Sequence, residues 1–368
     1  MAANTGTYLE PILQRHFTGH IGAISSIRFN INGDQIATAS TDASVILWDL
    51  KQAARCIRFG VHTGPVHGVS WSSNLIASTG QDRTVKIWEP KIRGVSCEFI
   101  AHCKTVRSVD FDPTGMMLIT ASDDKSVKLW KVAQRKFLTS FAYHTNWVRS
   151  AKFSPNGKLI ASCSDDKTLR IFDVNSGQCI RTFTEERGMG RQVAWHPTGN
   201  VVAVALSCNR VKLFDIAETE LIQLYQVHSA PVNDLSFHPN GNFMLTGSDD
   251  ETIKVLDLLE GRPIYTLTGH VGPVSAVSFS SDGSIFSSAG RDRKLLVWKS
   301  NLHTFDFSQF QAKVNETTCS KNALNTSASD QSILIDPRGT NTYNEQDENL
   351  QVLDGINTEK PHDNDGIR

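Results

Sequence analysis

The chain has 368 residues, of which 39% are hydrophobic and 20% charged, and its formal net charge is −1 at pH 7. This composition is typical of a globular protein, and the near-zero charge gives no support for a nucleic-acid partner. Its 7 scattered cysteines lack a C-x-x-C pair, which argues against disulfides and a zinc site and indicates an intracellular, reducing compartment. No apolar run approaches the roughly 18 residues that a membrane span needs.

The N-terminal residues 1–10 have no basic cluster followed by an apolar run, so we expect a flexible N-terminus and no signal peptide. Residues 12–17, ILQRHF, are expected to form a strand. They precede the first histidine of a repeat, and the last repeat lacks an apolar fourth strand of its own. We therefore predict that strand 12–17 completes the last unit and closes a ring, which removes open sheet edges.

A repeat of about 42 residues follows this strand. Histidines recur with spacings of 42, 40, 42, 84 and 42 residues, at His20, His62, His102, His144, His228 and His270. The gap of 84 is two periods, and Glu186 occupies the missing position. Each unit ends at a second recurring position, which holds Trp48, Trp88, Trp130, Phe172, Phe214, Leu256 and Trp298. The chain thus contains seven units.

Each unit is predicted to contain four short strands. In the fourth unit these are residues 148–153, 159–164, 169–173 and 179–183, separated by turn signals such as Pro155-Asn156-Gly157. Four strands per unit of this length, with His and Trp-Asp signals, describe one blade of a β-propeller. The chain resembles the WD-repeat family over residues 11–299, which implies an all-β, seven-bladed propeller.

Most units also carry a histidine, a hydroxyl ten residues before the aromatic position and an aspartate six before it. These are the ingredients of a serine hydrolase, but six of the seven units repeat them, whereas a catalytic site is needed once. We therefore predict no enzyme, no metal and no cofactor. The resemblance implies a buried hydrogen-bond network in which losing one member costs roughly 1–3 kcal/mol. Its predicted members are His20, Asp42, Trp48, His62, Asp82, Trp88, His102, Thr120, Asp124, Trp130, His144, Asp166, His228, Asp250, His270, Asp292 and Trp298.

The fifth unit is predicted to lack the network, because Glu186, Val204, Cys208 and Phe214 replace its four positions together. A half-satisfied network is less stable than an apolar core, so the joint loss is consistent. Nothing in the sequence supports a reactive thiol at Cys208.

The first strand of a unit carries apolar residues at offsets 0, 3 and 5, as at Val106, Val109 and Phe111, at Val148, Ala151 and Phe153, and at Val274, Val277 and Phe279, which predicts a β-bulge. The resemblance implies that residues flanking this bulge surround the central channel, on a face where partners bind. The candidate partner-binding residues are Trp147, Arg149, Arg191, Arg107, Met189, His67, Asn233 and Arg291. Trp147 is predicted to be a surface aromatic flanked by three arginines, and both residue types are enriched at binding hot spots.

An alternative interpretation of the same residues is a neutral, solvated rim. Arg107 and Arg149 would then pair with Asp123 and Asp165 of their own units, at about 0–1 kcal/mol per pair. Arg191 has Ser207 at the corresponding position, so it is predicted to be the least neutralised.

Residues 300–368 are predicted to form an acidic, polar and disordered tail. Residues 301–368 hold 11 Asp/Glu and 5 Lys/Arg, a net charge of −6, which leaves +5 for residues 1–300.

Several strings narrow the resemblance, among them HTNWVRSAKFSPNGKLIASCSDDKT and IKVLDLLEGRPIYTLTGH. They are similar to the Proteome-of-Centriole (Poc) WD-repeat proteins. This implies a scaffold in the cytoplasm and cytoskeleton, at the centrosome, centriole and cilium basal body, supporting centriole assembly, stability, length and cilium formation. Its partners would be centriolar or basal-body proteins, including microtubule-associated ones, with no nucleic acid, membrane or small-molecule substrate. The family usually ends in a coiled coil, but residues 300–368 show no sustained heptad.

The alternative function is a substrate receptor of a ubiquitin ligase, because an arginine cluster on such a face can bind phosphorylated peptides. The lack of a separate adaptor-binding domain before residue 11 counts against it.

Overall fold

The computed structural model describes residues 10–52, 56–91 and 94–302. All of them belong to one compact unit, Met1–Thr318, and a second unit, Cys319–Arg368, lies outside the described residues. The predictions for residues 1–9 and for the tail from residue 303 onward also lie outside them. Every regular element that the structure describes is a β-strand.

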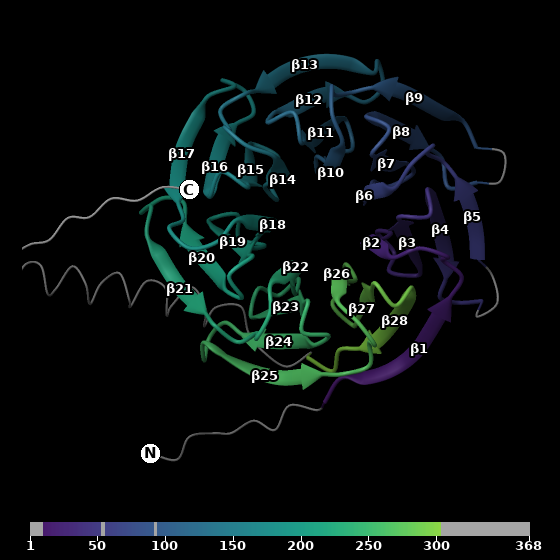
Figure 1. Ribbon diagram of the computed structural model, residues 1–368, viewed down its shortest axis with the longest axis vertical. Coiled ribbons are helices and arrows are strands. Elements are labelled where there is room, and N and C mark those ends of the chain that lie inside the picture. The colour runs from purple at the N-terminus through teal and green to yellow at the C-terminus, as the bar shows by residue number, and fades with distance from the viewer. Residues whose placement is uncertain (1–9, 53–55, 92–93, 303–368) are drawn as a thin grey trace, which may run out of the picture. The chain divides into compact units, whose positions relative to one another are not determined.

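The strands form seven antiparallel, four-stranded sheets that stand as blades around a common axis (Figure 1). Blades 1 to 3 comprise β2 (Ile24–Phe29), β3 (Gln35–Ser40), β4 (Ser44–Asp49), β5 (Cys56–Gly60); β6 (Val66–Trp71), β7 (Ile76–Gly80), β8 (Thr84–Trp88), β9 (Ser96–Ile100); β10 (Val106–Phe111), β11 (Met117–Ser122), β12 (Val127–Lys131) and β13 (Lys136–Phe141). Blades 4 and 5 comprise β14 (Val148–Phe153), β15 (Leu159–Ser164), β16 (Thr168–Asp173), β17 (Cys179–Thr184); β18 (Gly190–Trp195), β19 (Val201–Leu206), β20 (Val211–Asp215) and β21 (Leu221–Tyr225). Blades 6 and 7 comprise β22 (Val232–Phe237), β23 (Phe243–Ser248), β24 (Ile253–Asp257), β25 (Arg262–Leu267); β26 (Val274–Phe279), β27 (Ile285–Gly290), β28 (Lys294–Lys299) and β1 (Ile12–Thr18). The predicted seven-bladed, all-β propeller is confirmed.

The ring closes through β1, which pairs antiparallel with β28 as the outermost strand of blade 7 (Figure 1). Leu13 lies opposite Trp298 in this pair, and Thr18 lies opposite Lys294. The seam is also bridged by Asn301 Nδ2, which donates a hydrogen bond to the Glu10 carbonyl at 2.8 Å. The predicted closure by residues 12–17 is therefore confirmed.

The predicted boundary between propeller and tail, placed after residue 299, is too early, because Ser300 and Leu302 belong to the propeller. Ser300 and Leu302 are completely buried, and Leu302 packs in an apolar cluster with Phe243 and Trp298. The Ser300 N–H donates to the Ser284 carbonyl at 2.9 Å. A single leucine in a polar string gives no periodic signal, so the sequence could not mark this packing.

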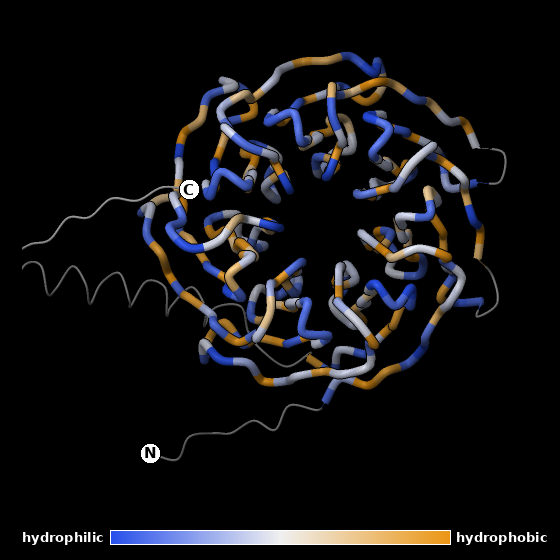
Figure 2. The backbone as a smooth tube through the Cα atoms, viewed as in Figure 1, coloured by the Kyte–Doolittle hydropathy of each residue, from blue (hydrophilic) through white to orange (hydrophobic). Residues whose placement is uncertain are grey.

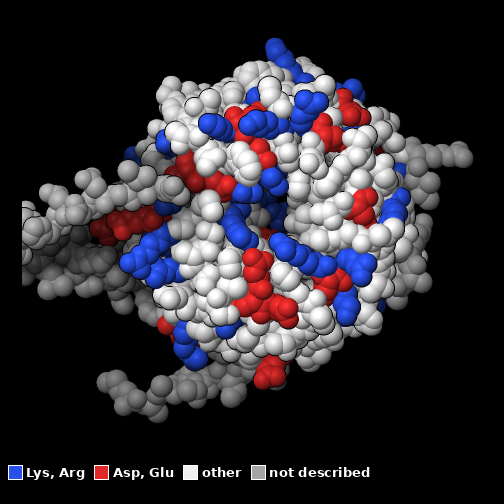
Figure 3. All heavy atoms as spheres, viewed as in Figure 1, with Lys and Arg blue, Asp and Glu red and all other residues white. Residues whose placement is uncertain are grey.

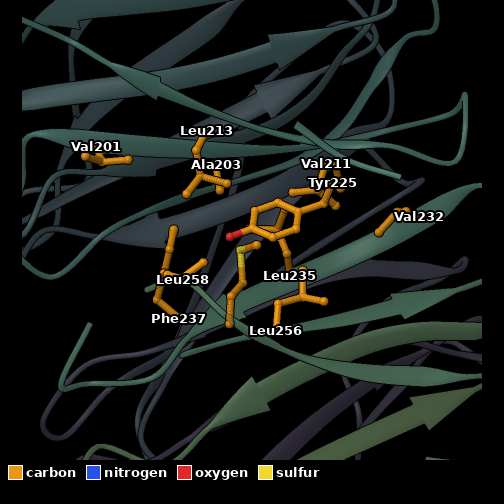
Figure 4. Packing of buried hydrophobic residues seen from close by; sticks show 12 residues of the cluster. Val201, Ala203, Val211, Leu213, Tyr225, Val232, Leu235, Phe237, Leu256 and Leu258 are labelled. Carbon is orange, nitrogen blue, oxygen red and sulfur yellow. The ribbon is translucent and has the colours of Figure 1, made fainter. Parts of the chain in front are cut away.

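The core lies between neighbouring blades, because the buried apolar clusters combine residues of adjacent blades. Figure 2 shows that hydrophobic and hydrophilic stretches alternate along the chain. Figure 4 shows the cluster between blades 5 and 6, in which Tyr225 lies near Leu235 and Leu256. Burying each large apolar side chain contributes roughly 1.5–3 kcal/mol, so the contacts between blades hold the ring together.

The predicted bulge is present in the innermost strand of every blade. In blade 4 the register shifts between Val148 and Ser150, and the other six inner strands shift at the equivalent position. The extra residue, Arg149 in blade 4, is left out of the regular pairing. Its side chain is thereby directed toward the central channel, where the candidate site lies.

Candidate functional site

The repeated His, hydroxyl and Asp side chains meet inside six blades, as predicted. In each of them the histidine Nδ1 lies 2.8 or 2.9 Å from an aspartate Oδ2, and its Nε2 lies 2.7–2.9 Å from a hydroxyl. The sets are His20–Asp42–Thr38, His62–Asp82–Ser78, His102–Asp124–Thr120, His144–Asp166–Ser162, His228–Asp250–Thr246 and His270–Asp292–Ser288. All six imidazoles are fully shielded from solvent, so these sets are structural.

Blade 3 shows the direction of the hydrogen bonds. Burial lowers the pKa of His102, although its hydrogen bond to Asp124 opposes the shift, so the ring is neutral at pH 7. Burial would raise the pKa of Asp124, but hydrogen bonds from His102 and Ser126 hold it below its usual value. His102 Nδ1–H therefore donates to Asp124, while its Nε2 accepts from the Thr120 hydroxyl. Thr120 in turn accepts from Trp130 Nε1–H at 3.0 Å, and both Thr120 and His102 are buried, so the hydroxyl is shielded from any substrate.

Among the described residues the indole hydrogen bond is made in blades 1, 3 and 7, whereas blades 4 and 6 carry Phe172 and Leu256 at that position. Trp88 occupies its predicted position in blade 2, but its buried Nε1–H has no hydrogen-bond partner in the described part of the chain. Its inclusion in the hydrogen-bond network was therefore wrong, and it contributes through packing. Blade 5 lacks the network, as predicted, because Val204 and Phe214 pack in an apolar cluster and Glu186 is exposed.

The candidate site is the channel mouth, which we define as the cavity of about 420 Å³ at one end of the central channel. It is lined by Ser25, His67, Arg107, Arg149, Asp165, Met189, Arg191, Ser207, Asn233, Ser275 and Arg291. The bulged residue of all seven blades is among them. On the face seen in Figure 3, Lys and Arg side chains gather around a central hollow, with acidic side chains beside them. Seven of the eight predicted partner-binding residues line this cavity, and Trp147 is the exception.

Two of the arginines at the channel mouth form the pairs that the alternative interpretation expected. Arg107 Nε and Nη2 donate to Asp123 at 2.8–3.1 Å, and Arg149 Nε and Nη2 donate to Asp165 at 2.8 and 2.6 Å. The hydrogen bond with Asp165 raises the pKa of Arg149, so it stays cationic. The carboxylates are only 8% and 9% exposed, whereas the arginines are 26% and 30% exposed. The accessible ends of both pairs are therefore positive.

Arg191 has no acidic partner in its own blade, as predicted, but blade 6 supplies one. Its Nη1 donates to Asn233 Oδ1 and lies 3.3 Å from Asp249 Oδ2. This ion pair is longer than the two pairs described above, and the Arg191 side chain is 36% exposed. The neighbouring blade thus partly neutralises the arginine that was predicted to be least neutralised.

Trp147 is a surface residue, as predicted, with 40% of its area exposed. Its ring lies 5.2 Å from Arg149 Cζ and 5.9 Å from Arg107 Cζ, so two of the three arginines predicted to flank it make cation–π contacts. Such contacts contribute about 0.5–1 kcal/mol at exposed sites and hold the ring in place. Met189 of the next blade is also 40% exposed. Together they add an apolar edge to a basic cavity.

A narrower section of the channel, with a cavity of about 120 Å³, was missed by the sequence analysis. There Lys152 Nζ lies 2.8 Å from Asp110 Oδ1, and Gln192 Nε2 donates to Asp234 Oδ1 at 2.7 Å. Burial lowers the pKa of Lys152 and raises that of Asp234. Both contacts join neighbouring blades, so this section stabilises the ring beneath the channel mouth.

The channel mouth offers hydrogen-bond donors, cations and an exposed indole. His67 is its one imidazole, and burial together with Arg107 and Arg149 lowers its pKa to about 4, which leaves it neutral at pH 7. Burial raises the pKa of the Cys163 thiol, which is therefore protonated. Among residues 10–52, 56–91 and 94–302 there is no group of three metal-ligating side chains, and no helix there could cross a membrane. The donors, cations and indole of the channel mouth and its edge suit non-covalent binding.

Comparison with known proteins identifies the repeats. The family model described as "WD domain, G-beta repeat" matches residues 12–49, 55–89, 95–131, 135–173, 219–257 and 261–299. The gap between residues 173 and 219 contains most of the fifth blade. Residues 184–232 match the model described as "Anaphase-promoting complex subunit 4 WD40 domain". The blade that lost its network is thus the one that the general repeat model omits.

Several curated proteins are similar to parts of the chain. A POC1 centriolar protein homolog of Drosophila melanogaster is 63% identical over 54 residues, which cover 15% of this chain and 14% of that protein. The POC1 centriolar protein homolog B of Rattus norvegicus is 52% identical over 50 residues, covering 14% and 10%. Protein HIR1 of Gibberella zeae is 27% identical over 139 residues, covering 33% and 13%. The chain therefore spans only 10–14% of the length of these relatives.

Proposed function

Because the chain belongs to the WD-repeat family, whose model matches more than half of its residues, we propose that it is a non-enzymatic, protein-binding scaffold of centrioles. The observation that carries this proposal is the 63% identity to a POC1 centriolar protein homolog. The rat relative, at 52% identity, bears the same description, while HIR1 is far less similar, at 27%.

The scaffold binds through the channel mouth together with Trp147, whose ring lies against Arg107 and Arg149 of that cavity. Trp147 and Met189 supply exposed apolar area, and arginines surround them. Tryptophan and arginine dominate binding energy at protein interfaces, where truncating one hot-spot residue costs about 2 kcal/mol or more. The arginine pairs hold the indole in a fixed position, so little side-chain entropy is lost when a partner covers it.

The finer role follows from the family resemblance. The scaffold supports centriole assembly, stability and length, and thereby cilium formation, with partners among the proteins of the centriole and basal body. A seven-bladed ring is suited to such a role because its rigid blades present one binding surface continuously, without a conformational change.

Proximity labelling in dividing cells tests this proposal against its alternative. The full chain is fused to a biotin ligase, and the same ligase alone serves as the control. The proposal predicts that centriolar wall proteins are the enriched neighbours. Enrichment of cullin-type ligase subunits without centriolar proteins would contradict it and would favour a ubiquitin-ligase substrate receptor.

A further inference from the structure

The channel mouth holds hydrogen-bond donors whose capacity is unused. Arg107 and Arg149 donate from Nε and Nη2 to Asp123 and Asp165, respectively. Within the described residues, the Nη1 of neither arginine has a hydrogen-bond partner. Arg191 uses only its Nη1. The Arg291 guanidinium makes no hydrogen bond in the described part of the chain, although its backbone N–H donates to the Pro273 carbonyl at 2.9 Å, and the His67 ring makes none either. Donors from five blades therefore face one cavity without matching acceptors.

The acids that pair with these arginines do not balance their charge. In blades 3, 4 and 6 the residue that follows the second strand is acidic: Asp123, Asp165 and Asp249. Blade 7 carries Arg291 at that position. Four arginines thus share three carboxylates, and two of those carboxylates are covered. The surface facing the cavity is positive.

The pKa of His67 is affected by the same positive charge. Its pKa is lowered first by burial and then by the charges of Arg107 and Arg149, while Asp123 opposes the shift. Two arginines that repel a proton from this ring would attract an anion placed beside it. An anion at the channel mouth would accordingly raise the pKa of His67, which makes the ring an internal reporter of binding.

We propose that the channel mouth binds a phosphate monoester carried on a side chain of the partner protein. This inference rests on the proposed function, because it names the chemical group by which that partner is recognised. A phosphate offers three acceptor oxygens and a charge of about −1.5 to −2, which matches several unpartnered guanidinium N–H groups. A carboxylate offers two oxygens and one charge, so it would leave donors unmatched. Trp147 lies against two of these arginines and would pack on the residues flanking the phosphate.

The test uses the full chain and three small probes: inorganic phosphate, N-acetyl-phosphoserine amide and N-acetyl-glutamate amide. Binding is followed at pH 7 and constant ionic strength through the ring resonances of His67, assigned with a His67→Gln variant. Arg291→Gln and Arg191→Gln remove hydrogen-bond donors, and neither substitution leaves the buried carboxylates of Asp123 and Asp165 without their arginine partners. Arg262→Gln is the matched control, because Arg262 lies on the outermost strand of blade 6 and pairs with Glu260.

We expect the phosphoserine probe to shift the His67 resonances and to bind at least about tenfold more tightly than the glutamate probe. Each channel-mouth variant should weaken that binding at least about fivefold, and Arg262→Gln less than about twofold. No shift of His67, an equal affinity for glutamate, or an equal loss in Arg262→Gln would overturn the proposal. Inorganic phosphate binding as tightly as phosphoserine would also overturn it, because the site would then serve a free anion. Failure of the probes with normal centriolar labelling removes only this inference, whereas loss of centriolar neighbours removes the proposed function.

Discussion

Replacing His102 with alanine tests whether the buried networks stabilise the propeller. The imidazole is fully shielded and makes hydrogen bonds of 2.8 Å to Asp124 and 2.7 Å to Thr120. Asp124 keeps its 2.6 Å hydrogen bond from the Ser126 hydroxyl, so the substitution removes only part of its hydrogen bonding. The unpaired groups cost roughly 1–3 kcal/mol, and the cavity left by the ring adds about 2 kcal/mol. We expect the free energy of unfolding to fall by about 3–5 kcal/mol.

The control is Glu186→Ala, which alters the equivalent position of blade 5. Glu186 is exposed and that blade has no network, so the change should lie within about 0.5 kcal/mol. Urea unfolding followed by tryptophan fluorescence measures both variants, and thermal unfolding provides an independent midpoint. Equal losses in the two variants would show that the networks do not carry the stability assigned to them.

Three further predictions concern the core, the chain boundary and pH. Tyr225→Phe should raise the free energy of unfolding by about 1 kcal/mol in urea titrations, because the buried hydroxyl has no hydrogen-bond partner in the described part of the chain; a loss of stability would reveal a partner. Ending the chain after Leu302 should leave the melting temperature unchanged, whereas ending it after Lys299 should cost about 1.5–3 kcal/mol through loss of the buried leucine; identical melting temperatures would contradict this. Burial lowers the pKa of His20, His102 and His270 below 6.5, so the unfolded chain binds more protons in acid, and stability should be constant above about pH 7 and fall as the pH drops toward 5. A flat stability profile between pH 7 and 5, measured by urea unfolding, would be incompatible with buried neutral histidines.

The sequence predicted those features that repeat within each blade at a constant spacing. The closing strand, the bulge and the His–Asp pairs belong to this class, because every unit must satisfy the same backbone geometry. The exposure of Trp147 followed from the family resemblance, which implies that residues flanking the bulge surround the channel.

Contacts between blades could not be predicted in this way. Asp110 accepts a hydrogen bond from the Phe153 N–H at 3.1 Å, and Asp234 accepts one from the Val277 N–H at 2.9 Å. Each acid occurs at its strand position in one blade, while serines accept the equivalent bond in others: Ser70 and Ser236 at the position of Asp110, and Ser26 and Ser108 at that of Asp234. The acids themselves are therefore not part of a repeat. The ion pair of Arg191 with the acid of the next blade was missed for the same reason.

Blade 5 shows a second limit of sequence reasoning. Its lost network was predicted, but the replacement was not. Glu185, one residue before the vacant histidine position, is buried and lies 2.6 Å from Lys212 Nζ. A one-residue offset from the repeat places this pair outside any comparison of equivalent positions.

The most direct test of the binding role assigned to the channel mouth is the centriolar localisation of Trp147→Ala. Leu224→Ala is the matched control, because Leu224 lies on the outermost strand of blade 5 and is 43% exposed, compared with 40% for Trp147. Both purified variants should melt close to the wild-type temperature, since each loses an exposed side chain. At equal expression, Trp147→Ala should be depleted from centrioles, in line with a hot-spot loss of about 2 kcal/mol or more, and Leu224→Ala should localise normally. Equal centriolar signals for the two variants, or unfolding of Trp147→Ala, would contradict a partner-binding role for the channel mouth.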